Sequence, residues 1–347
     1  ASPLGARHEI AMAQAAQPTG PVTHGKAWVE MVHRYLATSV GFLILVLAVA
    51  TWVVRRRERL APHGSQRGVA SLSAARPPGG AKGPSGGSGA HTVGAHGGVL
   101  SAWWPAATLV WVCLQGAFGA LTVTWKLYPA IVTLHLLGAM VLLALLCIQA
   151  VRYGQAAQSR LPVPLSPALR ALLWFTAGAV LLQIALGGWV STNYAVLACT
   201  QFPTCQDSWW PPMNFAQGFE IWRELGTASH GAPIEFAALT AIHYAHRLMA
   251  YLVFASIGLL AWQLLRHAPA LRTQARWLIG LALAQLATGL GNVLLGWPLV
   301  AALLHTGGAA ALAVVLTWTL CESRRAIAAM PARLAAGLAP NTKVLEQ

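Results

Sequence analysis

Three observations predict that this chain is an all-α polytopic membrane protein. Apolar residues make up 56% of its 347 residues and charged residues only 9%, with a mean hydropathy of +0.56, values that soluble globular domains do not reach. Seven apolar stretches are long enough, at about 20 residues each, to cross a bilayer core. Lysine and arginine gather in alternate connections between these stretches.

Each stretch is expected to be a transmembrane α-helix, because lipid offers no hydrogen-bonding partner to an unpaired backbone group. A helix of about 20 residues spans the roughly 30 Å of the hydrocarbon core. The predicted spans are residues 33–54, 103–124, 129–151, 169–190, 241–265, 274–294 and 299–320.

The basic residues predict the orientation of these spans. Of the 23 lysines and arginines, 17 lie in residues 55–102, 152–170, 266–276 and 321–347. By the positive-inside rule these segments are cytoplasmic, which places the C-terminus inside and residue 1 outside. The net charge of +14 does not indicate a nucleic-acid partner, because the basic residues separate apolar segments and form no single basic face. Membrane lipid is the expected surrounding.

Residues 62–98 differ in composition from the rest of the chain. They consist largely of Gly, Ser, Pro, Ala and Arg, which cannot bury enough surface to offset chain entropy. We therefore predict a disordered cytoplasmic linker, whose histidines lack accompanying Cys or carboxylate ligands. The predicted organisation is an outer-loop remnant (1–32), an N-terminal half with this linker (33–151), a cytoplasmic connection (152–168), a C-terminal half (169–320) and a cytoplasmic tail (321–347).

The two halves repeat a pattern of histidines. The segment Glu30-x-x-His33-Arg34-x-x-Ala37 recurs 213 residues later as His243-x-x-His246-Arg247-x-x-Ala250. The segment Gln115-x-x-x-Gly119, followed by His135, recurs 170 residues later as Gln285-x-x-x-Gly289, followed by His305. The offsets differ by 43, about the length of the linker, so one helical unit with one insertion explains both. Because a further helix precedes the motif only in the second half, we expect that this chain lacks one N-terminal helix of an eight-helix parent.

The four repeated histidines are candidate haem-iron ligands. His33 and His246 lie near the outer ends of their helices, and His135 and His305 lie about six residues beyond a proline, at the same depth. Two parallel helices that each present an imidazole form the bis-His arrangement of a b-type haem. The alternative for a single histidine is an interhelical hydrogen bond or a snorkelling side chain. Zinc is disfavoured, because two histidine pairs do not complete its usual four-ligand shell.

Three charged residues lie beside these histidines. Arg34 and Arg247 are candidate contacts to haem propionates, for which a guanidinium is well shaped, although an arginine that snorkels to water fits equally. Glu30 shares a helix face with His33, and its repeat counterpart is His243. A carboxyl near a membrane-embedded site is costly, so we expect proton-coupled chemistry at the N-terminal site and an electron-transfer or structural role at the C-terminal site. A helix-end Glu favoured by the helix dipole is the alternative.

Cys199 and Cys205 lie in the predicted outer loop, on the oxidising side of the membrane. We predict a disulfide between them. A structural role is the simpler interpretation, and a redox-active role is the alternative.

The chain resembles the haem A synthase family of respiratory-oxidase assembly proteins through motifs that cover nearly all of it except the linker. The matching segments are Glu30-Met-Val-His33-Arg34, Gln115-Gly-Ala-Phe-Gly119-Ala-Leu-Thr122-Val, Thr133-Leu-His135-Leu, Gly188-Trp-Val-Ser191-Thr-Asn193-Tyr, Cys199-Thr-Gln-Phe-Pro203-Thr-Cys205, His246-Arg247 and His305.

The resemblance implies an eight-helix parent with two pseudo-symmetric four-helix halves, in a bacterial inner membrane with its haem sites toward the periplasm. It implies that a ring methyl of haem O is oxidised by successive hydroxylation to the formyl group of haem A. Substrate haem O maps onto His33 and His135, with Glu30 catalytic, and cofactor haem b onto His246 and His305. Haem O synthase and oxidase assembly factors become candidate protein partners.

Two other functions share some of these features. A dihaem b-type cytochrome that only transfers electrons would use the same four histidines but gives Glu30 no task of its own. A haem transporter or chaperone would need a route that changes sides, whereas the predicted ligands all lie near one face. Conversion of haem O to haem A separates the synthase from both.

Overall fold

The computed structural model describes residues 7–16, 24–60, 103–228 and 231–325 of the chain. These residues belong to two compact units, residues 1–117 and residues 118–347. The predicted linker at 62–98 and most of the predicted tail, from residue 326 on, lie outside the described residues.

The first unit contains α1 (Arg7–Ala16), α2 (His24–Leu60) and most of α3 (Trp103–Thr124), whose last turns belong to the second unit. The predicted span 33–54 lies inside α2, which begins nine residues earlier than predicted. Residues 1–32, predicted as an outer-loop remnant, therefore include α1 and the first turns of α2. The sequence underestimated this helix because the span was placed by hydropathy alone, whereas polar residues continue a helix readily.

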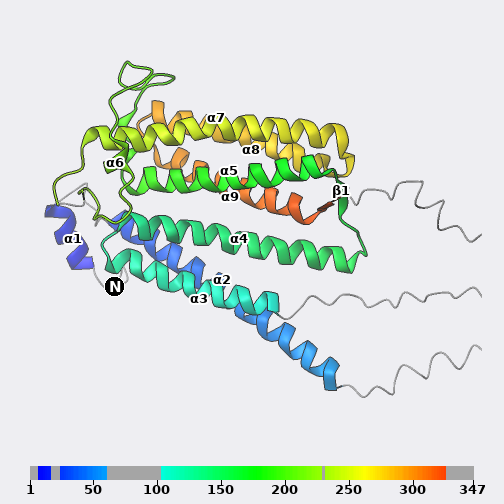
Figure 1. Ribbon diagram of the computed structural model, residues 1–347. Coiled ribbons are helices and arrows are strands. Elements are labelled where there is room, and N and C mark those ends of the chain that lie inside the picture. The colour runs from blue at the N-terminus through cyan, green and yellow to red at the C-terminus, as the bar shows by residue number, and fades with distance from the viewer. Residues whose placement is uncertain (1–6, 17–23, 61–102, 229–230, 326–347) are drawn as a thin grey trace, which may run out of the picture. The chain divides into compact units, whose positions relative to one another are not determined.

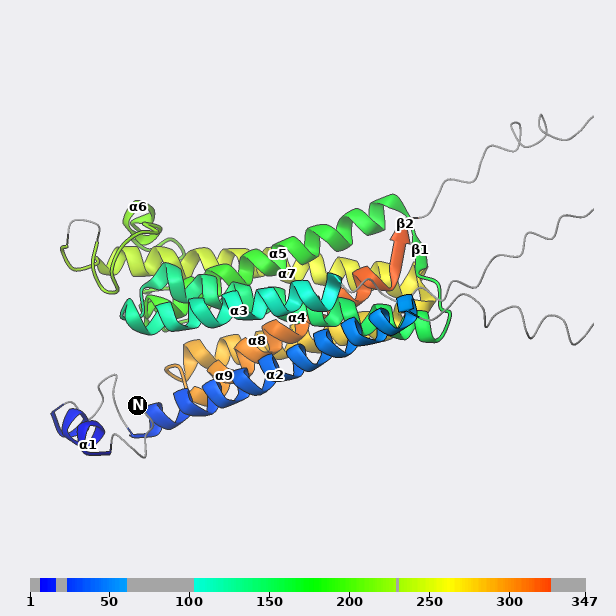
Figure 2. The same ribbon diagram turned by 90° about the horizontal axis from the view of Figure 1, so that it is seen from below.

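The second unit is a bundle of long helices that run nearly side by side (Figures 1 and 2). Its long helices are α4 (Pro129–Ala157), α5 (Pro167–Thr192), α7 (Phe236–His267), α8 (Arg272–Leu294) and α9 (Leu299–Cys321). Pro129 and Pro167 begin their helices, where a missing N–H costs no hydrogen bond. Ser166 caps α5 by accepting a hydrogen bond from the Leu169 amide at 3.3 Å, which satisfies one of the unpaired groups at the helix start.

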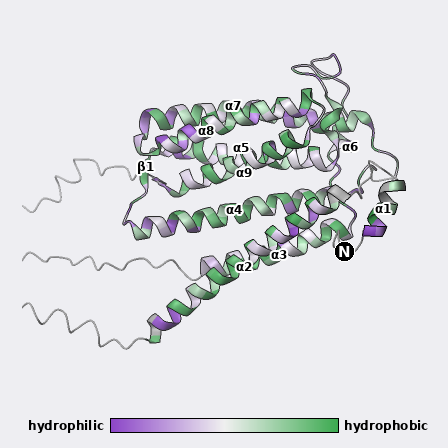
Figure 3. Ribbon diagram, turned by 180° about the vertical axis from the view of Figure 1, so that it is seen from behind, coloured by the Kyte–Doolittle hydropathy of each residue, from purple (hydrophilic) through white to green (hydrophobic). Residues whose placement is uncertain are grey.

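Leucines of four helices form the core of this unit. Leu173 of α5, Leu260 and Leu264 of α7, Leu278 of α8 and Leu316 of α9 are all within 2% of complete burial. Many other large apolar side chains are exposed, and most residues of the long helices are green or white in Figure 3. Exposed apolar surface of this extent is expected of helices that face lipid.

Seven helices of the described residues are long and apolar enough to cross a membrane, and each corresponds to one predicted span. The fold class predicted from the sequence, an all-α polytopic membrane protein, is therefore confirmed. The multi-pass arrangement follows from the same helices.

One end of the second unit carries two short strands that the sequence analysis did not predict. β1 (Val163–Leu165) pairs in parallel with β2 (Ser323–Arg325), with Val163 opposite Ser323. Arg170 donates from Nη1 to the Ser323 carbonyl at 2.8 Å, and Gln155 donates from Nε2 to the Cys321 carbonyl at 3.1 Å. These bonds join the predicted cytoplasmic connection to the start of the predicted tail. The single-turn helix η2 (Pro269–Leu271) connects α7 to α8.

The opposite end of the second unit carries a folded loop between α5 and α7 (Figure 1), which contains η1 (Ala195–Ala198) and α6 (Phe215–Gly218). Trp189 donates from Nε1 to the Gly218 carbonyl at 2.9 Å, and Gln206 donates from Nε2 to Thr240 Oγ1 at 2.8 Å. Arg223 is buried and donates from Nη2 to Asn193 Oδ1 at 2.5 Å. The loop is therefore fixed to the ends of α5 and α7 by side-chain hydrogen bonds.

Candidate functional site

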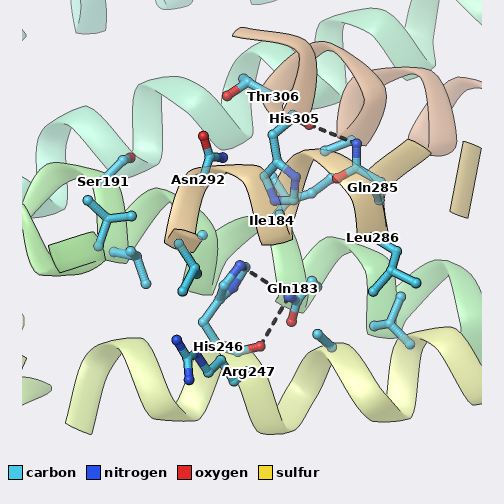
Figure 4. A pocket seen from close by; sticks show the side chains of 18 of the residues that line it. Gln183, Ile184, Ser191, His246, Arg247, Gln285, Leu286, Asn292, His305 and Thr306 are labelled. Atoms are coloured by element: carbon cyan, nitrogen blue, oxygen red, sulfur yellow. Dashed lines mark hydrogen bonds between the residues drawn. The ribbon is translucent and has the colours of Figure 1, made fainter. Parts of the chain in front are cut away.

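A cavity of about 340 Å³ lies within the second unit, between α5, α7, α8 and α9. Its walls are mostly apolar. Figure 4 shows that His246 of α7 and His305 of α9 point into it from opposite sides. The other lining residues with polar side-chain atoms are Gln183, Ser191, His243, Arg247, Tyr251, Gln285, Asn292, Trp297 and Thr306. A largely apolar cavity with a few convergent polar groups is the usual form of a cofactor site.

His246 is held against α5 by two residues. Gln183 donates from Nε2 to the His246 carbonyl at 3.2 Å, and the same amide nitrogen lies 3.3 Å from His246 Nε2. A Cβ added at Gly187 would lie 3.0 Å from Cε1 of the His246 ring. The His246 Nδ1 atom is buried and has no hydrogen-bond partner among the described residues. The imidazole is therefore fixed in place, with Nε2 against the Gln183 amide and Nδ1 uncommitted among the described residues.

His305 has a defined tautomer. Its Nδ1 lies 3.0 Å from Thr288 Oγ1, and that hydroxyl also lies 2.8 Å from the Ala284 carbonyl oxygen. Because a carbonyl oxygen can only accept, the single hydroxyl proton of Thr288 goes to Ala284, and Nδ1–H of His305 donates to the hydroxyl. The lone pair is then on Nε2, which is the state in which a histidine coordinates a metal.

These features fit an iron porphyrin held between His246 and His305. The buried Nδ1 of His246 and the buried Oδ1 of Asn292 lack partners among the described residues, and such groups are costly unless something satisfies them. Gly187 and Gly289 provide bare backbone against which the two imidazoles lie. Two histidines across an apolar cavity are a sufficient protein ligand set for a b-type haem.

His243 and Arg247 form a clamp beside the cavity. His243 lies 3.1 Å from the Ala195 carbonyl through Nδ1, and its Nε2 accepts from Arg247 Nε at 3.2 Å. The remaining bonds of Arg247 go to main-chain carbonyls of the outer loop, those of Thr204 at 3.2 Å, Cys199 at 3.0 Å and Gln201 at 2.8 Å. Four of the five guanidinium N–H groups are thereby used. A propionate contact from Arg247 stays a prediction, and one Nη1–H is left for it.

The carbonyls that Arg247 binds belong to a loop closed by a disulfide. Cys199 and Cys205 are both fully buried and bonded to each other, so the disulfide predicted from the sequence is present in the structure. Phe202, within this loop, lines the cavity. The disulfide loop is therefore both the partner of the clamp and part of the cavity wall.

The residues predicted for the N-terminal site lie in both units. In the first unit, Glu30 and Arg34 form an ion pair at 2.5 Å with both side chains 54% exposed, and His33 between them is exposed. In the second unit, His135 is half-buried, and a Cβ added at Gly119 would lie 3.1 Å from its Cε1. The pairing of His33 with His135, the role of Glu30 and the propionate contact of Arg34 stay predictions.

The helix that carries His135 also forms part of the C-terminal cavity. Leu136, the next residue of α4, lines the cavity with His246 and His305. A Cβ added at Gly188 of α5 would lie 3.0 Å from a Leu136 methyl and 3.2 Å from the Thr133 methyl. His135 is therefore one residue away from the wall of the cavity that contains the other histidine pair.

Two features of the site were missed in the sequence. Gln183-x-x-x-Gly187 is a third copy of the Gln-x-x-x-Gly pattern, and it contacts His246 as Gln285-x-x-x-Gly289 contacts His305. The identical spacing was a usable signal. The bond of His243 to Arg247 was also missed, although residues four apart on a helix are neighbours.

Comparison with known proteins gives matches over most of the chain. A family model described as cytochrome oxidase assembly protein matches residues 1–317. A protein of Shewanella oneidensis named heme A synthase is 30% identical over 312 residues, which cover 89% of this chain and 80% of that protein.

Two more relatives carry the same name. The heme A synthase of Methylobacterium radiotolerans is 32% identical over 55% of this chain and 51% of its own length. That of Symbiobacterium thermophilum is 29% identical over 58% of this chain and 60% of its own length. The chain therefore belongs to the cytochrome oxidase assembly protein family, as the resemblance in its motifs predicted.

Proposed function

We propose that this chain is a haem A synthase, a membrane oxidoreductase that converts a ring methyl of haem O to the formyl group of haem A. Membership of the family and the name shared by three relatives support this proposal. The structural observation that carries it is the pair His246 and His305, which face each other across an apolar cavity within the membrane-spanning helices.

The cavity of the second unit is proposed to bind haem b, through His246 and His305. Haem b supplies one-electron redox chemistry when it is bound. Thr288 keeps the lone pair of His305 on Nε2 by accepting from Nδ1, and Gln183 ties α7 to α5 at the His246 carbonyl. The lining is mostly apolar, which disfavours water in the site.

The substrate haem O is proposed to bind through His33 and His135. Written with water as the oxygen donor, oxidation of the methyl to the formyl group releases four electrons and four protons, and the proposed haem b would accept the electrons one at a time. Glu30 is proposed to accept these protons, since a carboxylate can act as a general base when it lies within reach of the reacting group. Arg34 donates from Nη2 to Glu30 Oε1 at 2.5 Å and so orients this carboxylate.

One observation favours the second candidate function, a dihaem b-type electron-transfer cytochrome. Glu30 and His243 occupy equivalent repeat positions, and each accepts a hydrogen bond from the arginine four residues later. Both residues therefore bind the arginine four residues later, and this structural role requires no proton chemistry.

Product analysis tests the proposal. The chain is produced in membranes together with a source of haem O, and the haems are extracted and separated by chromatography. The unsubstituted chain is expected to form haem A or its hydroxylated precursor. Glu30→Gln is expected to reduce the yield about 100-fold or more, the usual contribution of a general base. Glu224→Gln in the outer loop is the matched control, because it removes a carboxylate that the proposed site does not use.

The candidates give different results in the same experiment. If the unsubstituted chain binds haem but converts none of it, the electron-transfer cytochrome is favoured. Haem A formed at the parent level by Glu30→Gln would show that Glu30 has no proton role.

A further inference from the structure

A glutamine and a glycine spaced four residues apart accompany each histidine of the cavity. On α5, Gln183 donates from Nε2 to the main-chain carbonyl of His246 at 3.2 Å. On α8, Gln285 donates from Nε2 to the main-chain carbonyl of His305 at 3.0 Å. In both cases the amide reaches the backbone of the neighbouring helix at the histidine itself, as Figure 4 shows.

The glycine of each pair lies against the imidazole. A Cβ added at Gly187 would lie 3.0 Å from Cε1 of His246 and 3.7 Å from each of its ring nitrogens. A Cβ added at Gly289 would lie 3.2 Å from Cε1 of His305 and 3.7 Å from its Nδ1. Contacts this short are rare for a real Cβ, so a side chain at either position would displace the ring. The Cε1 edge therefore rests on bare backbone, and the nitrogens are turned to either side.

Other glycines of the same helices provide an internal comparison. A Cβ added at Gly178 of α5 or at Gly280 of α8 would meet no atom within 4 Å. Among the described glycines of α5 and α8, only those one turn after the glutamine lie against an imidazole, whereas Gly188 lies against Leu136 and Thr133. Gly119 of α3 makes the same contact with His135, at 3.1 Å from Cε1.

The spacing explains how the two residues act together. Residues four apart lie on the same face of a helix, about one turn from each other. The glutamine sets the depth and rotation of the neighbouring helix at the histidine, and the glycine sets the plane of the ring. A ligand held in this way loses less conformational freedom when it binds a metal.

We propose that Gln183 with Gly187, and Gln285 with Gly289, are positioning residues that orient His246 and His305 for axial coordination of haem iron. This inference rests on the proposed function, which places a haem between the two histidines. It extends to Gly119, which orients His135 in the same manner.

The test uses the full chain, purified in detergent and titrated with haemin, and compares substitutions that differ only in position. Gly187→Ala and Gly289→Ala are expected to weaken haem binding by roughly 10- to 100-fold, the usual effect of residues that orient metal ligands. They are also expected to convert part of the six-coordinate, low-spin spectrum to a high-spin form that binds carbon monoxide. Gly178→Ala and Gly280→Ala are the matched controls and are expected to keep the parent spectrum.

A second pair of variants covers the case in which an added methyl group prevents folding. Gln183→Met and Gln285→Met keep the side-chain volume and remove only the amide donor, so they are expected to change the spin state in the same direction. The positioning inference would be overturned if the glycine and glutamine variants bound haem as the unsubstituted chain does. That result means the same affinity, the same low-spin spectrum and no binding of carbon monoxide. A parent protein that shows no low-spin haem would instead overturn the proposed cofactor site, so the two failures are distinguishable.

Discussion

Thr288 is the residue whose single hydroxyl decides the protonation of a proposed ligand. Its proton is committed to the Ala284 carbonyl, so it can only accept from His305 Nδ1. Partners of this kind fix the tautomer and the orientation of a metal-binding imidazole. The side chain therefore contributes to iron binding without any contact to iron.

Replacement of Thr288 by valine removes this acceptor and keeps the shape of the side chain. We expect Thr288→Val to lower the affinity for haem by about 10-fold or more and to shift the reduction potential, because the imidazole becomes less basic. Haemin titration and a spectroelectrochemical titration measure these effects. Thr317→Val is the control, since among the described residues the Thr317 hydroxyl on α9 donates to Ala313 of its own helix. An unchanged affinity and potential would contradict the assigned tautomer.

Arg34 and Arg247 occupy equivalent positions in the repeat but different surroundings. Arg247 is 9% exposed and binds three loop carbonyls, whereas Arg34 makes an exposed pair with Glu30. Arg247→Met leaves buried acceptors unpaired, which is expected to cost about 3 kcal/mol. Arg34→Met is expected to cost at most about 1 kcal/mol. Thermal unfolding of both variants in the same detergent measures the difference, and equal midpoints would show that the clamp does not stabilise the loop.

Among the elements, the helices were predictable and the short strands were not. Seven long apolar stretches contain enough residues for hydropathy to find every helix, with bounds as close as those of residues 103–124 and α3, or nine residues late as at the start of α2. β1 and β2 have three residues each, too few to show a periodicity.

The partners of Arg247 could not be predicted for another reason. They are main-chain carbonyls, and main-chain groups leave no mark in the sequence. The histidines of the cavity were predictable because they are repeated in the sequence. Gln183-x-x-x-Gly187 repeats the same spacing as the other two pairs, so it could have been predicted in the same way. The pairing of His33 with His135 rests on the same repeat and stays a prediction.

The disulfide loop is the element that connects the clamp to the cavity. Its closure by Cys199 and Cys205 keeps three carbonyls on Arg247 and Phe202 on the cavity wall. We expect the double variant Cys199→Ser/Cys205→Ser to lose bound haem several-fold faster, because a loop without its cross-link samples open conformations. Transfer of haem to excess apomyoglobin measures the rate. Cys113→Ser, at an exposed cysteine of α3, is the control, and equal rates in both variants would refute a barrier role for the loop.

At the scale of the whole molecule, the distribution of charge and the strand pairing point to the same topology. Lysine and arginine gather in residues 152–170 and 321–347, and β1 and β2 join these two segments at one end of the second unit. The disulfide loop lies at the other end (Figure 1). The strand pairing places the two basic segments at the same end of the second unit, as their charge predicts, and the cytoplasmic location of that end stays a prediction.

Reporter fusions test this orientation. A fluorescent protein fused after Gln347 is expected to fluoresce, because it matures in the cytoplasm. Alkaline phosphatase inserted at Asp207 is expected to be active, because it matures on the outer side of the membrane. Exchange of the two reporters between these positions is the control and is expected to give neither signal. Activity of alkaline phosphatase at residue 347 would reverse the topology.

The packing of Leu136 against Gly188 couples the cavity of the second unit to His135. If the proposed haem displaces Leu136 from the cavity wall, the backbone of His135, its neighbour on α4, would move with it. Because coupling between two binding events is reciprocal, the occupancy of either histidine site then changes the affinity of the other. We therefore expect a haemin titration to show that binding of one proposed haem changes the affinity for the other.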